Sequence, residues 1–267
     1  MRVVILTSGR SGLASICLPD LCKSKGLVVT GIILAHRPMQ SRRQLFLRKV
    51  KKIRRIGILG ALNGVRIRQW FRQERIEDIG DVARAFGIPL HETDIINSEL
   101  TRKLLREANA DLGLSLGNPY IGEAVFSIPR QGMINIHGEV LPQFQGAQSV
   151  IWPIHEKVWE TGFTIHQINR GIDKGSILYQ EVYPIEFART LRETVEINSA
   201  HTTSKIPAAL VHVCEGYEEI RRNARKQENG KSYTTPTIWQ FLRMTINNRR
   251  MYRKSRQQPS LVGRPSK

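Results

Sequence analysis

The sequence contains few cysteines and no long hydrophobic segment. Its 267 residues include three cysteines, Cys17, Cys22 and Cys214. An odd number without the spacing of metal ligands predicts neither a disulfide framework nor a zinc site, and it fits a reducing cytoplasm. No stretch of about 18 apolar residues occurs, and the apolar run before Thr7 is too short for a signal-peptide core. These absences predict a soluble, cytoplasmic protein.

Acidic residues are scarce in two segments of the chain. The whole sequence has 41 Lys and Arg against 23 Asp and Glu, a net charge of +18. Residues 37–75 carry a net charge of +12 and residues 217–267 carry +10, which leaves −4 for the remainder. Two basic segments on a mildly acidic body predict contact with a polyanion, which is nucleic acid, a nucleotide or an anionic membrane. Solvated charge without a partner is the alternative.

Short apolar segments alternate with helical segments along most of the chain. We expect strands at 2–6, 28–35, 89–93, 112–116, 133–137, 164–168 and 177–185, and helices at 13–26, 79–86, 99–108, 150–157 and 191–214. This alternation predicts an α/β fold with a mostly parallel, Rossmann-like sheet and helices on both faces. Such sheets bind ligands at the carboxyl ends of their strands.

The sequence lacks the spaced glycines of dinucleotide folds and the Gly-Lys-Ser/Thr of a P-loop. Instead, the segment TSGRSG, residues 7–12, joins the first expected strand to the first expected helix. A helix N-terminus attracts anions, so residues 8–11 would suit the phosphate of an acceptor substrate. An ordinary turn explains the segment equally well.

An amide and an imidazole lie two residues apart in INIHGEVLPQFQG, residues 134–146. On a strand, Asn135 and His137 point to the same face. An Asn amide can donate to an oxyanion, and a His can take a proton from an amine. Asp173 lies in a turn between Gly171 and Gly175, and these glycines would let the turn approach the imidazole. The set suits acyl transfer to an amine, and a hydrogen-bonded pair in the core is the alternative.

Residues 132–185 resemble the catalytic core of the folate-dependent formyltransferases. The matching elements occur in the family's order: Asn135, His137, Leu141-Pro142, Gly146-Ala147, Glu160-Thr161-Gly162, Thr164, Gly171, Asp173 and Gly175. The resemblance extends less specifically over 1–36 and 77–190. It implies a catalytic domain at 1–190 with a basic helical insertion at 37–76. A helical extension with a basic tail would follow at 191–267.

The resemblance implies transfer of a formyl group from 10-formyltetrahydrofolate to a primary amine, without a metal ion. Asn135 would hold the oxyanion of the tetrahedral intermediate. His137 would face that oxyanion and assist proton transfer, and Asp173 would orient His137 and raise its basicity. The pterin would lie mainly against the backbone of two loops, formed by Asn118, Pro119, Tyr120 and Ile121 and by Asn169, Arg170, Gly171 and Ile172.

Two features depart from the family's pattern. Glu139 stands where the family usually has Ser, and it is either a contact to the formyl acceptor or a solvated loop residue, the interpretation we favour. Methionyl-tRNA formyltransferases carry a β-barrel after the catalytic domain, but the residues after Cys214 do not alternate like barrel strands. They predict a turn, one short helix and a basic tail.

The basic insertion also holds apolar side chains among its charges: Phe46, Val50, Ile53, Leu59, Leu62, Trp70 and Phe71. In methionyl-tRNA formyltransferases a basic loop at a similar place reaches the tRNA acceptor stem. A basic amphipathic helix can instead lie on anionic lipid, so residues 41–75 predict either contact. A helical pair packed on the domain with solvated charges is the third interpretation.

These features leave several functions open. We expect a methionyl-tRNA-like formyl acceptor first, and a nucleotide- or lipid-linked amino sugar as the alternative. Either acceptor would be a polyanion or carry phosphate. A hydrolase that releases formate belongs to the same family, and a catalytically idle folate- or RNA-binding module is the alternative from another class. The expected location is cytoplasmic, with peripheral membrane contact through the insertion.

Overall fold

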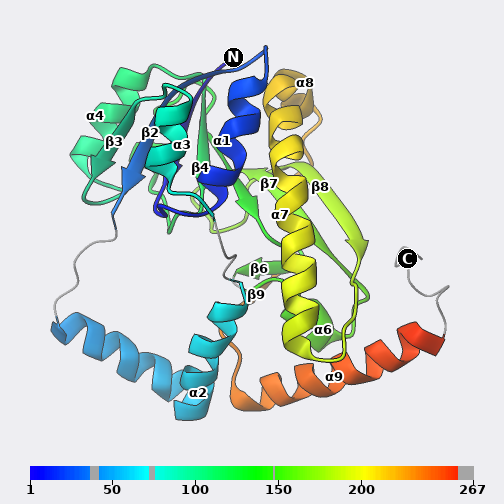
Figure 1. Ribbon diagram of the computed structural model, residues 1–267. Helices are drawn as coiled ribbons and strands as arrows, with labels where there is room; N and C mark the ends of the chain where they lie inside the picture. Colours follow the sequence, from blue (N-terminus) through cyan, green and yellow to red (C-terminus); the bar gives the residue numbers. More distant parts are fainter. Residues whose placement is uncertain (37–41, 72–75, 147, 258–267) are drawn as a thin grey trace.

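The sheet at the centre of the protein is mostly parallel. The computed structural model describes residues 1–36, 42–71, 76–146 and 148–257, and within these ranges seven strands form one sheet in the order β3-β2-β1-β4-β5-β7-β8 (Figure 1). The strands are β1 (Arg2–Thr7), β2 (Val28–Ala35), β3 (Leu90–Thr93), β4 (Leu112–Leu116), β5 (Met133–His137), β7 (Glu160–Gln167) and β8 (Ile177–Pro184). Neighbours from β3 to β5 are parallel, whereas β7 is antiparallel to β5 and to β8. The predicted fold class is confirmed.

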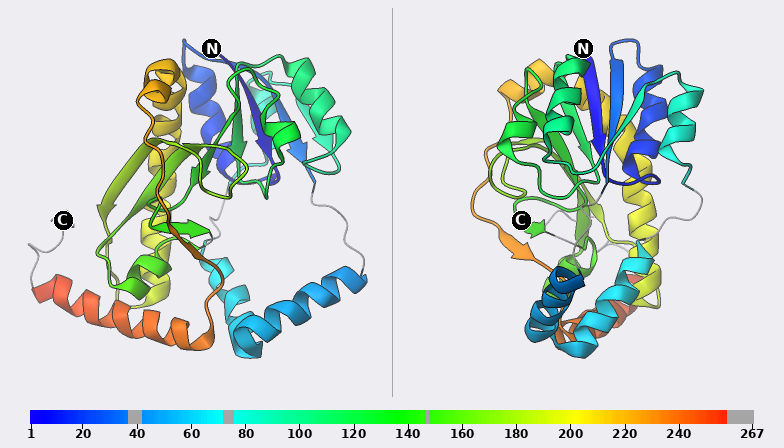
Figure 2. Two further views of the ribbon diagram at one scale, coloured as in Figure 1. Left: turned by 180° about the vertical axis from the view of Figure 1, so that it is seen from behind. Right: turned by 90° about the vertical axis from the view of Figure 1, so that its left-hand side faces the viewer.

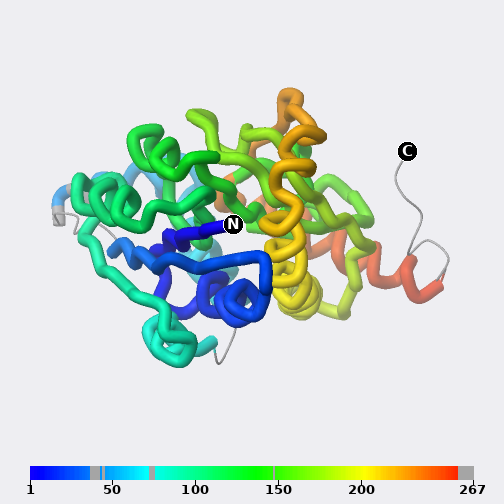
Figure 3. The backbone as a smooth tube through the Cα atoms, turned by 90° about the horizontal axis from the view of Figure 1, so that it is seen from above, coloured from blue at the N-terminus to red at the C-terminus, as the bar shows by residue number. Residues whose placement is uncertain are grey.

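Helices cover both faces of this sheet, as the alternation of side chains along β1 shows. These helices are α1 (Leu13–Lys23), α3 (Ile79–Ala85), α4 (Glu99–Ala108), α5 (Glu123–Phe126) and α7 (Leu191–Glu215). Val3 and Ile5 belong to a core shared with α1, α3 and α7, whereas Val4 and Leu6 belong to a core shared with α4 and α5. Figure 3 shows α1 and α3 on one side of the strands and α4 and α5 on the other. Successive residues of a buried strand therefore enter opposite cores.

Strand β7 begins earlier than predicted. We expected a strand at 164–168, but pairing with β8 starts at Glu160. Phe163 is fully buried in the sheet core, and this burial outweighs the weakening effect of the preceding Gly162 on a strand.

A second hydrophobic core lies beside the sheet and joins segments far apart in the sequence. It is built from the end of α2 (Arg42–Trp70), α6 (Ile151–Glu156), the first turns of α7 and α9 (Ile238–Gln257). Trp70 packs against Phe241, with 6.0 Å between ring centroids. Two short strands, β6 (Phe144–Gly146) and β9 (Lys231–Tyr233), pair in parallel here (Figure 2). Residues 231–233 are thereby brought beside the segment that follows β5.

The segment after α8 (Tyr217–Arg222) contains more regular structure than predicted. We expected one short helix, but α9 spans 20 residues. It is long because Phe241, Met244 and Met251 recur on one face and are buried in the second core. Strand β9 was not predicted, because a strand of three residues is too short to show an alternation of apolar and polar side chains. The basic tail predicted beyond residue 257 lies outside the described residues.

Helix α7 belongs to both cores. Leu191 and Val195 lie in the second core, whereas Leu210 and Val213 lie in the first. The extension predicted to start at residue 191 thus shares its packing with the sheet. Its assignment as a separate unit stays a prediction.

The basic insertion forms helix α2 over its described residues. The helix is kinked at Gly57, whose φ of 75° lies in the left-handed region that favours glycine. Beyond the kink Ile67 and Trp70 are buried, whereas Leu59 and Leu62 are exposed. Trp70 therefore does not belong to an apolar face free for lipid, which was one of the three interpretations of the insertion. In the described part of the chain, no helix is long and apolar enough to cross a bilayer.

Candidate active site

Three adjacent strands bring polar side chains together. Asn135 of β5 pairs with Ser115 of β4 on one side and with His166 of β7 on the other. Ser115 Oγ donates to Asn135 Oδ1 at 3.3 Å, and Asn135 Nδ2 lies 3.3 Å from His166 Nε2. Strand β5 ends at His137, so Asn135 and His137 lie at its carboxyl end.

The loop between β7 and β8 returns Asp173 to these residues. Asp173 has a left-handed backbone with φ of 54°, a conformation that Asp adopts more readily than most residues. A Cβ at Gly175 would lie 1.6 Å from the Gln167 carbonyl oxygen, so only glycine permits this close turn. The Gly146 N–H donates to Asp173 Oδ2 at 3.0 Å and holds the carboxylate in place.

Both ring nitrogens of His137 face protein atoms. Nε2 lies 2.7 Å from the Phe144 carbonyl oxygen and donates to it, because a carbonyl only accepts. Nδ1 lies 3.6 Å from Asp173 Oδ2, an ion-pair distance longer than a hydrogen bond. The structure brings Asn135, His137 and Asp173 together as the sequence predicted, while their catalytic roles stay predictions.

His166 is a site residue that the sequence analysis missed. Its Nδ1 donates to the Gln167 carbonyl at 2.8 Å, so Nε2 of the neutral ring accepts from Asn135 Nδ2. Nε2 also lies 3.8 Å from Asp173 Oδ1, which places the carboxylate between two imidazoles. Burial lowers the pKa of His166 and favours the neutral ring. The signal was present, because His166 follows Thr164 by two residues on the same strand face.

A cavity of about 560 Å³ opens at these residues. Its wall contains Asn135, His137, His166, Asp173 and seven of the eight residues predicted to hold the pterin: Asn118, Pro119, Tyr120, Ile121, Asn169, Gly171 and Ile172. The volume suits a cofactor-sized ligand. Residues 232–235 complete the wall from the C-terminal part of the chain, which no local sequence pattern indicated.

The two asparagines of the predicted pterin loops use their side chains to shape those loops. Asn118 Nδ2 donates to the Leu6 carbonyl at 2.5 Å, and Asn169 Nδ2 donates to the Lys174 carbonyl at 3.1 Å. The side chains thereby fix the loop backbone around the cavity. This arrangement fits a ligand held mainly by main-chain groups, as the resemblance implied.

Arg170 and the segment TSGRSG form ion pairs with carboxylates of the protein. Arg170 does not line the cavity, because its guanidinium is exposed and pairs with Glu123 at 2.7 Å. In the segment TSGRSG, Arg10 forms ion pairs with Asp78 at 3.4 Å and with Glu92 at 2.5 Å. The positive charge of this segment is thus already matched by carboxylates.

Glu139 is buried, so its interpretation as a solvated loop residue is wrong. Its side chain accepts hydrogen bonds from the Val150 N–H at 2.5 Å, the Thr161 hydroxyl at 2.7 Å and the Val140 N–H at 3.1 Å. Burial raises the pKa of Glu139 to about 7 despite these three donors. The loop after β5 turns inward here because the carboxylate satisfies backbone groups at the start of α6 that water cannot reach.

Cations of α2 lie at one side of the cavity. Arg55 lines the cavity wall. Burial, together with the charges of Arg68 and Arg55, lowers the pKa of the nearby Lys52. No ion pair between α2 and an acidic side chain occurs among the described residues. This group of like charges would be stabilised by an anion.

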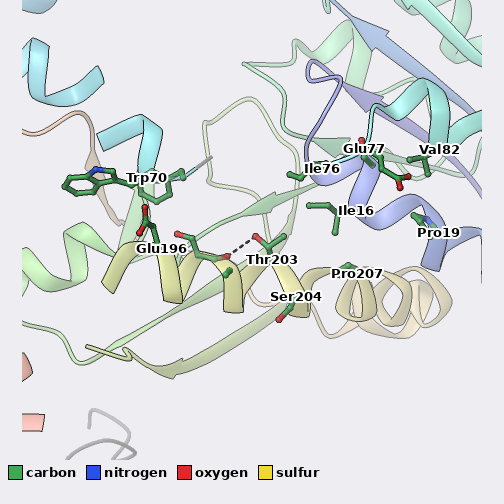
Figure 4. Close-up of a pocket in the computed structure, with 14 residues that line it drawn as sticks. Ile16, Pro19, Trp70, Ile76, Glu77, Val82, Glu196, Thr203, Ser204 and Pro207 are labelled. Carbon is green, nitrogen blue, oxygen red and sulfur yellow. Dashed lines mark hydrogen bonds between the residues drawn. The ribbon is translucent and has the colours of Figure 1, made fainter. Parts of the chain in front are cut away.

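A larger hollow of about 800 Å³ lies elsewhere and shares no lining residue with the cavity. Figure 4 shows it between Ile16 and Pro19 of α1, Val82 of α3, and Thr203 and Pro207 of α7. Its wall contains none of the predicted site residues, which gather at the smaller cavity instead. Among the described residues, no group of three His, Cys, Asp or Glu is arranged to hold a metal ion.

Comparison with known proteins identifies the family. A family model described as formyl transferase matches residues 69–212, more than half of the 267 residues. The chain therefore belongs to the formyl transferase family, and the protein is an enzyme, a formyltransferase.

Solved structures share the fold across most of the chain. Glycinamide ribonucleotide transformylase 1 from Symbiobacterium toebii is 17% identical, with 85% of this chain and 94% of that chain covered and a TM-score of 0.57. A sugar N-formyltransferase from Shewanella sp is 16% identical, with coverage of 93% and 87% and a TM-score of 0.56. An N-formyltransferase from Helicobacter canadensis, complexed with folinic acid and dTDP-3-aminofucose, is 16% identical, with coverage of 94% and 81% and a TM-score of 0.51. At such identities the likeness establishes the fold alone.

Proposed function

We propose that this formyltransferase transfers a formyl group from 10-formyltetrahydrofolate to the primary amine of a phosphorylated amino sugar. The grouping of Asn135, His137 and Asp173 at the wall of a cavity of about 560 Å³ carries the proposal. The pterin loops supply the other wall. Folate would supply the formyl carbon, already at the oxidation level of formate.

The residues of the site fit the steps of this transfer. A bond forms between the amine nitrogen and the formyl carbon, the bond from that carbon to folate N10 breaks, and one amine proton passes to N10. Asn135 would donate its amide N–H to the formyl oxygen as negative charge develops there. Asp173 lies between His137 and His166 and would hold the transferred proton together with these rings.

The neutral His166 is the better placed proton acceptor of the two imidazoles. His137 Nε2 donates to the Phe144 carbonyl, whereas His166 Nε2, whose lone pair accepts from Asn135 Nδ2, also lies 3.8 Å from Asp173 Oδ1, where the transferred proton would arrive. We therefore assign His137, in the form that carries a proton on both ring nitrogens, to hold Asp173 through Nδ1 and to stabilise negative charge. His166 takes the more direct part in proton transfer.

A phosphorylated formyl acceptor is supported by the cations beside the cavity. Arg55 lines the wall, and Lys52 and Arg68 lie next to it without an ion pair to a described acidic residue. Phosphate would offset both the burial and the repulsion by Arg68 and Arg55 that lower the pKa of Lys52. The solved structure from Helicobacter canadensis contains a nucleotide-linked amino sugar, which is an acceptor of this chemical type.

Methionyl-tRNA is the second candidate, because α2 carries ten Lys and Arg and no acidic residue. It ranks second because the neighbouring structure from Helicobacter canadensis holds a nucleotide-linked amino sugar.

Assay of the purified protein with 10-formyltetrahydrofolate and a panel of amines separates the candidates. The panel holds amino sugars linked to nucleotides, amino sugars linked to polyprenyl phosphate, and methionyl-tRNA. We expect mass spectrometry to detect formylated amino sugar with stoichiometric tetrahydrofolate release. Formylation of methionyl-tRNA alone would reject the amino-sugar acceptor, and formate release without any amine product would reject the transfer itself.

A further inference from the structure

We propose that α2 and α9 together form a docking surface for an anionic lipid bilayer. The surface consists of exposed apolar side chains with Lys and Arg around them: Phe46, Leu47, Ile58, Leu59, Leu62 and Val65 on α2, and Trp239, Leu242 and Ile246 on α9. It lies at the end of the molecule opposite the N-terminus (Figures 1 and 2). The inference does not depend on which amine receives the formyl group.

Helix α9 is apolar on two opposite sides. Phe241 and Met244 face the second core and are buried, as expected for the inner side of a surface helix. Trp239, Leu242 and Ile246 recur at intervals of three and four residues on the other side, and Trp239 is 77% exposed. Water-facing helix positions normally hold polar residues, so this second apolar stripe indicates a partner.

Helix α2 shows the same pattern beyond its kink. Ile67 and Trp70 are buried against the protein, whereas Ile58, Leu62 and Val65 recur on the opposite side and are exposed. Leu62, for example, is 64% exposed. The apolar side chains that pack the helix are thus different from those that face water.

The first half of α2 buries none of its described side chains. From Arg43 to Arg55, every described side chain is exposed or half-buried, and none is buried. A helix of this length is marginally stable in water by itself. A bilayer would supply the missing surface, because a basic amphipathic helix places its apolar side chains below the headgroups and its cations among them.

The positive charge of α2 and α9 indicates which kind of partner binds this docking surface. Helices α2 and α9 together carry 16 Lys and Arg and no Asp or Glu. A second copy of the protein would bring the same positive charge, so self-association through this face is opposed by repulsion. Nucleic acid would neutralise the cations but leave Leu62 and Leu242 in water, because phosphates offer aliphatic side chains no apolar contact. An anionic bilayer satisfies both kinds of side chain.

The docking surface is continuous with the active site. Arg55 lies on the same helix as Leu59 and Leu62 and also lines the cavity. A docked α2 would therefore hold the rim of the cavity against the headgroups. An amine carried by a phosphorylated membrane lipid could reach the site without leaving the bilayer.

Sedimentation with vesicles tests the proposal on the intact protein. We expect binding to vesicles of phosphatidylcholine with phosphatidylglycerol and little binding to pure phosphatidylcholine. The double variant Leu59→Gln, Leu62→Gln should weaken the partition coefficient about tenfold or more, because its apolar contacts are lost. The matched control Val28→Thr, Leu100→Gln changes exposed apolar residues elsewhere and should bind like the parent.

A second variant avoids any dependence on packing. Arg48→Gln, Lys49→Gln and Lys51→Gln change exposed side chains in the first half of α2, and each lost charge should weaken binding about fivefold. The blue shift of Trp fluorescence on vesicle addition should disappear in Trp239→Phe. Absence of binding to anionic vesicles at low salt would overturn the proposal. Unchanged vesicle binding by the apolar variant would also overturn it. Full displacement of the vesicles by tRNA would indicate nucleic acid as the partner instead. Loss of a dimer as the only effect of the apolar variant would indicate self-association instead.

Discussion

At the scale of single residues, Glu139 is the least expected feature of the site. Its carboxyl group is 3% exposed and lies one residue beyond Gly138, on the loop that follows His137. Three donors bind it, and burial still raises its pKa to about 7. Substrate contact is not needed to explain this residue, because it satisfies the Val150 N–H at the start of α6.

Replacement of Glu139 should change how stability depends on pH. The folded protein holds the Glu139 proton up to about pH 7, whereas an unfolded chain releases it near 4.5. The free energy of unfolding therefore falls as pH rises through this window, by about 3 kcal/mol from this group. Glu139→Gln cannot ionise, so its unfolding free energy, measured in urea from pH 4.5 to 7.5, should lack this fall.

The comparison needs a matched control, because other groups also titrate in this window. His166 acts in the opposite direction. Because its pKa is lowered in the folded protein, the free energy of unfolding falls as pH drops below 6.5, the usual pKa of His. The difference between parent and variant removes such shared contributions. Glu228→Gln, an exposed position, should follow the parent. Parallel curves for the parent and Glu139→Gln would show that Glu139 ionises normally in the folded protein.

Catalysis should depend on Asn135 and Asp173 in different ways. Asn135→Ala removes the proposed oxyanion donor and should lower kcat by two to three orders of magnitude, about 2.7–4 kcal/mol. Asp173→Asn preserves the left-handed turn but removes the charge between the two imidazoles, with a loss of about 10²–10⁴-fold. Folate binding, measured by titration calorimetry, should change little. Rates near the parent's with the true formyl acceptor would place the chemistry elsewhere.

At the scale of elements, α2 has two functions in our proposals, since one side contacts lipid and one residue reaches the cavity. The apolar and basic composition predicted a helix over the insertion, and the structure has one. It could not predict that Trp70 turns inward, because this depends on Phe241, 171 positions later in the chain. Composition specifies an amphipathic helix, and packing decides which apolar residues remain exposed.

Arg55 should act on binding of the formyl acceptor and not on chemistry. Arg55→Gln removes a charge at the cavity wall, so KM for a phosphorylated acceptor should rise about tenfold or more with kcat nearly unchanged. Arg54→Gln is the matched control, because Arg54 is exposed and does not line the cavity. Steady-state kinetics with both variants check this. Equal KM values for the two variants would exclude a phosphate contact at Arg55.

At the scale of the whole molecule, the two hydrophobic cores are joined by α7. Leu210→Ala removes a fully buried side chain from the first core, and Met244→Ala removes one from the second. Each should lower the free energy of unfolding by about 2–5 kcal/mol. Because α7 enters both cores, we expect one cooperative transition with the same denaturant slope for both variants and the parent.

Two separate transitions, with each variant shifting a different one, would contradict this expectation. They would support the boundary predicted at residue 190 as a division between independently folding units. Circular dichroism and tryptophan fluorescence in urea report the helices and the aromatic second core, so disagreement between the two probes would reveal such units.

The sequence by itself determined the fold class, strand β5 and the residue types of the site. Asn135 and His137 share a face because the two-residue periodicity of a strand is a local property. Gly175 indicated a turn that approaches the sheet closely. Tertiary structure alone decided the burial of Glu139, the position of His166 between Asn135 and Asp173, and the closure of the cavity by residues 232–235. These features arise from contacts between distant segments. The free energy of such contacts depends on which surfaces meet, and no local pattern of residues records that.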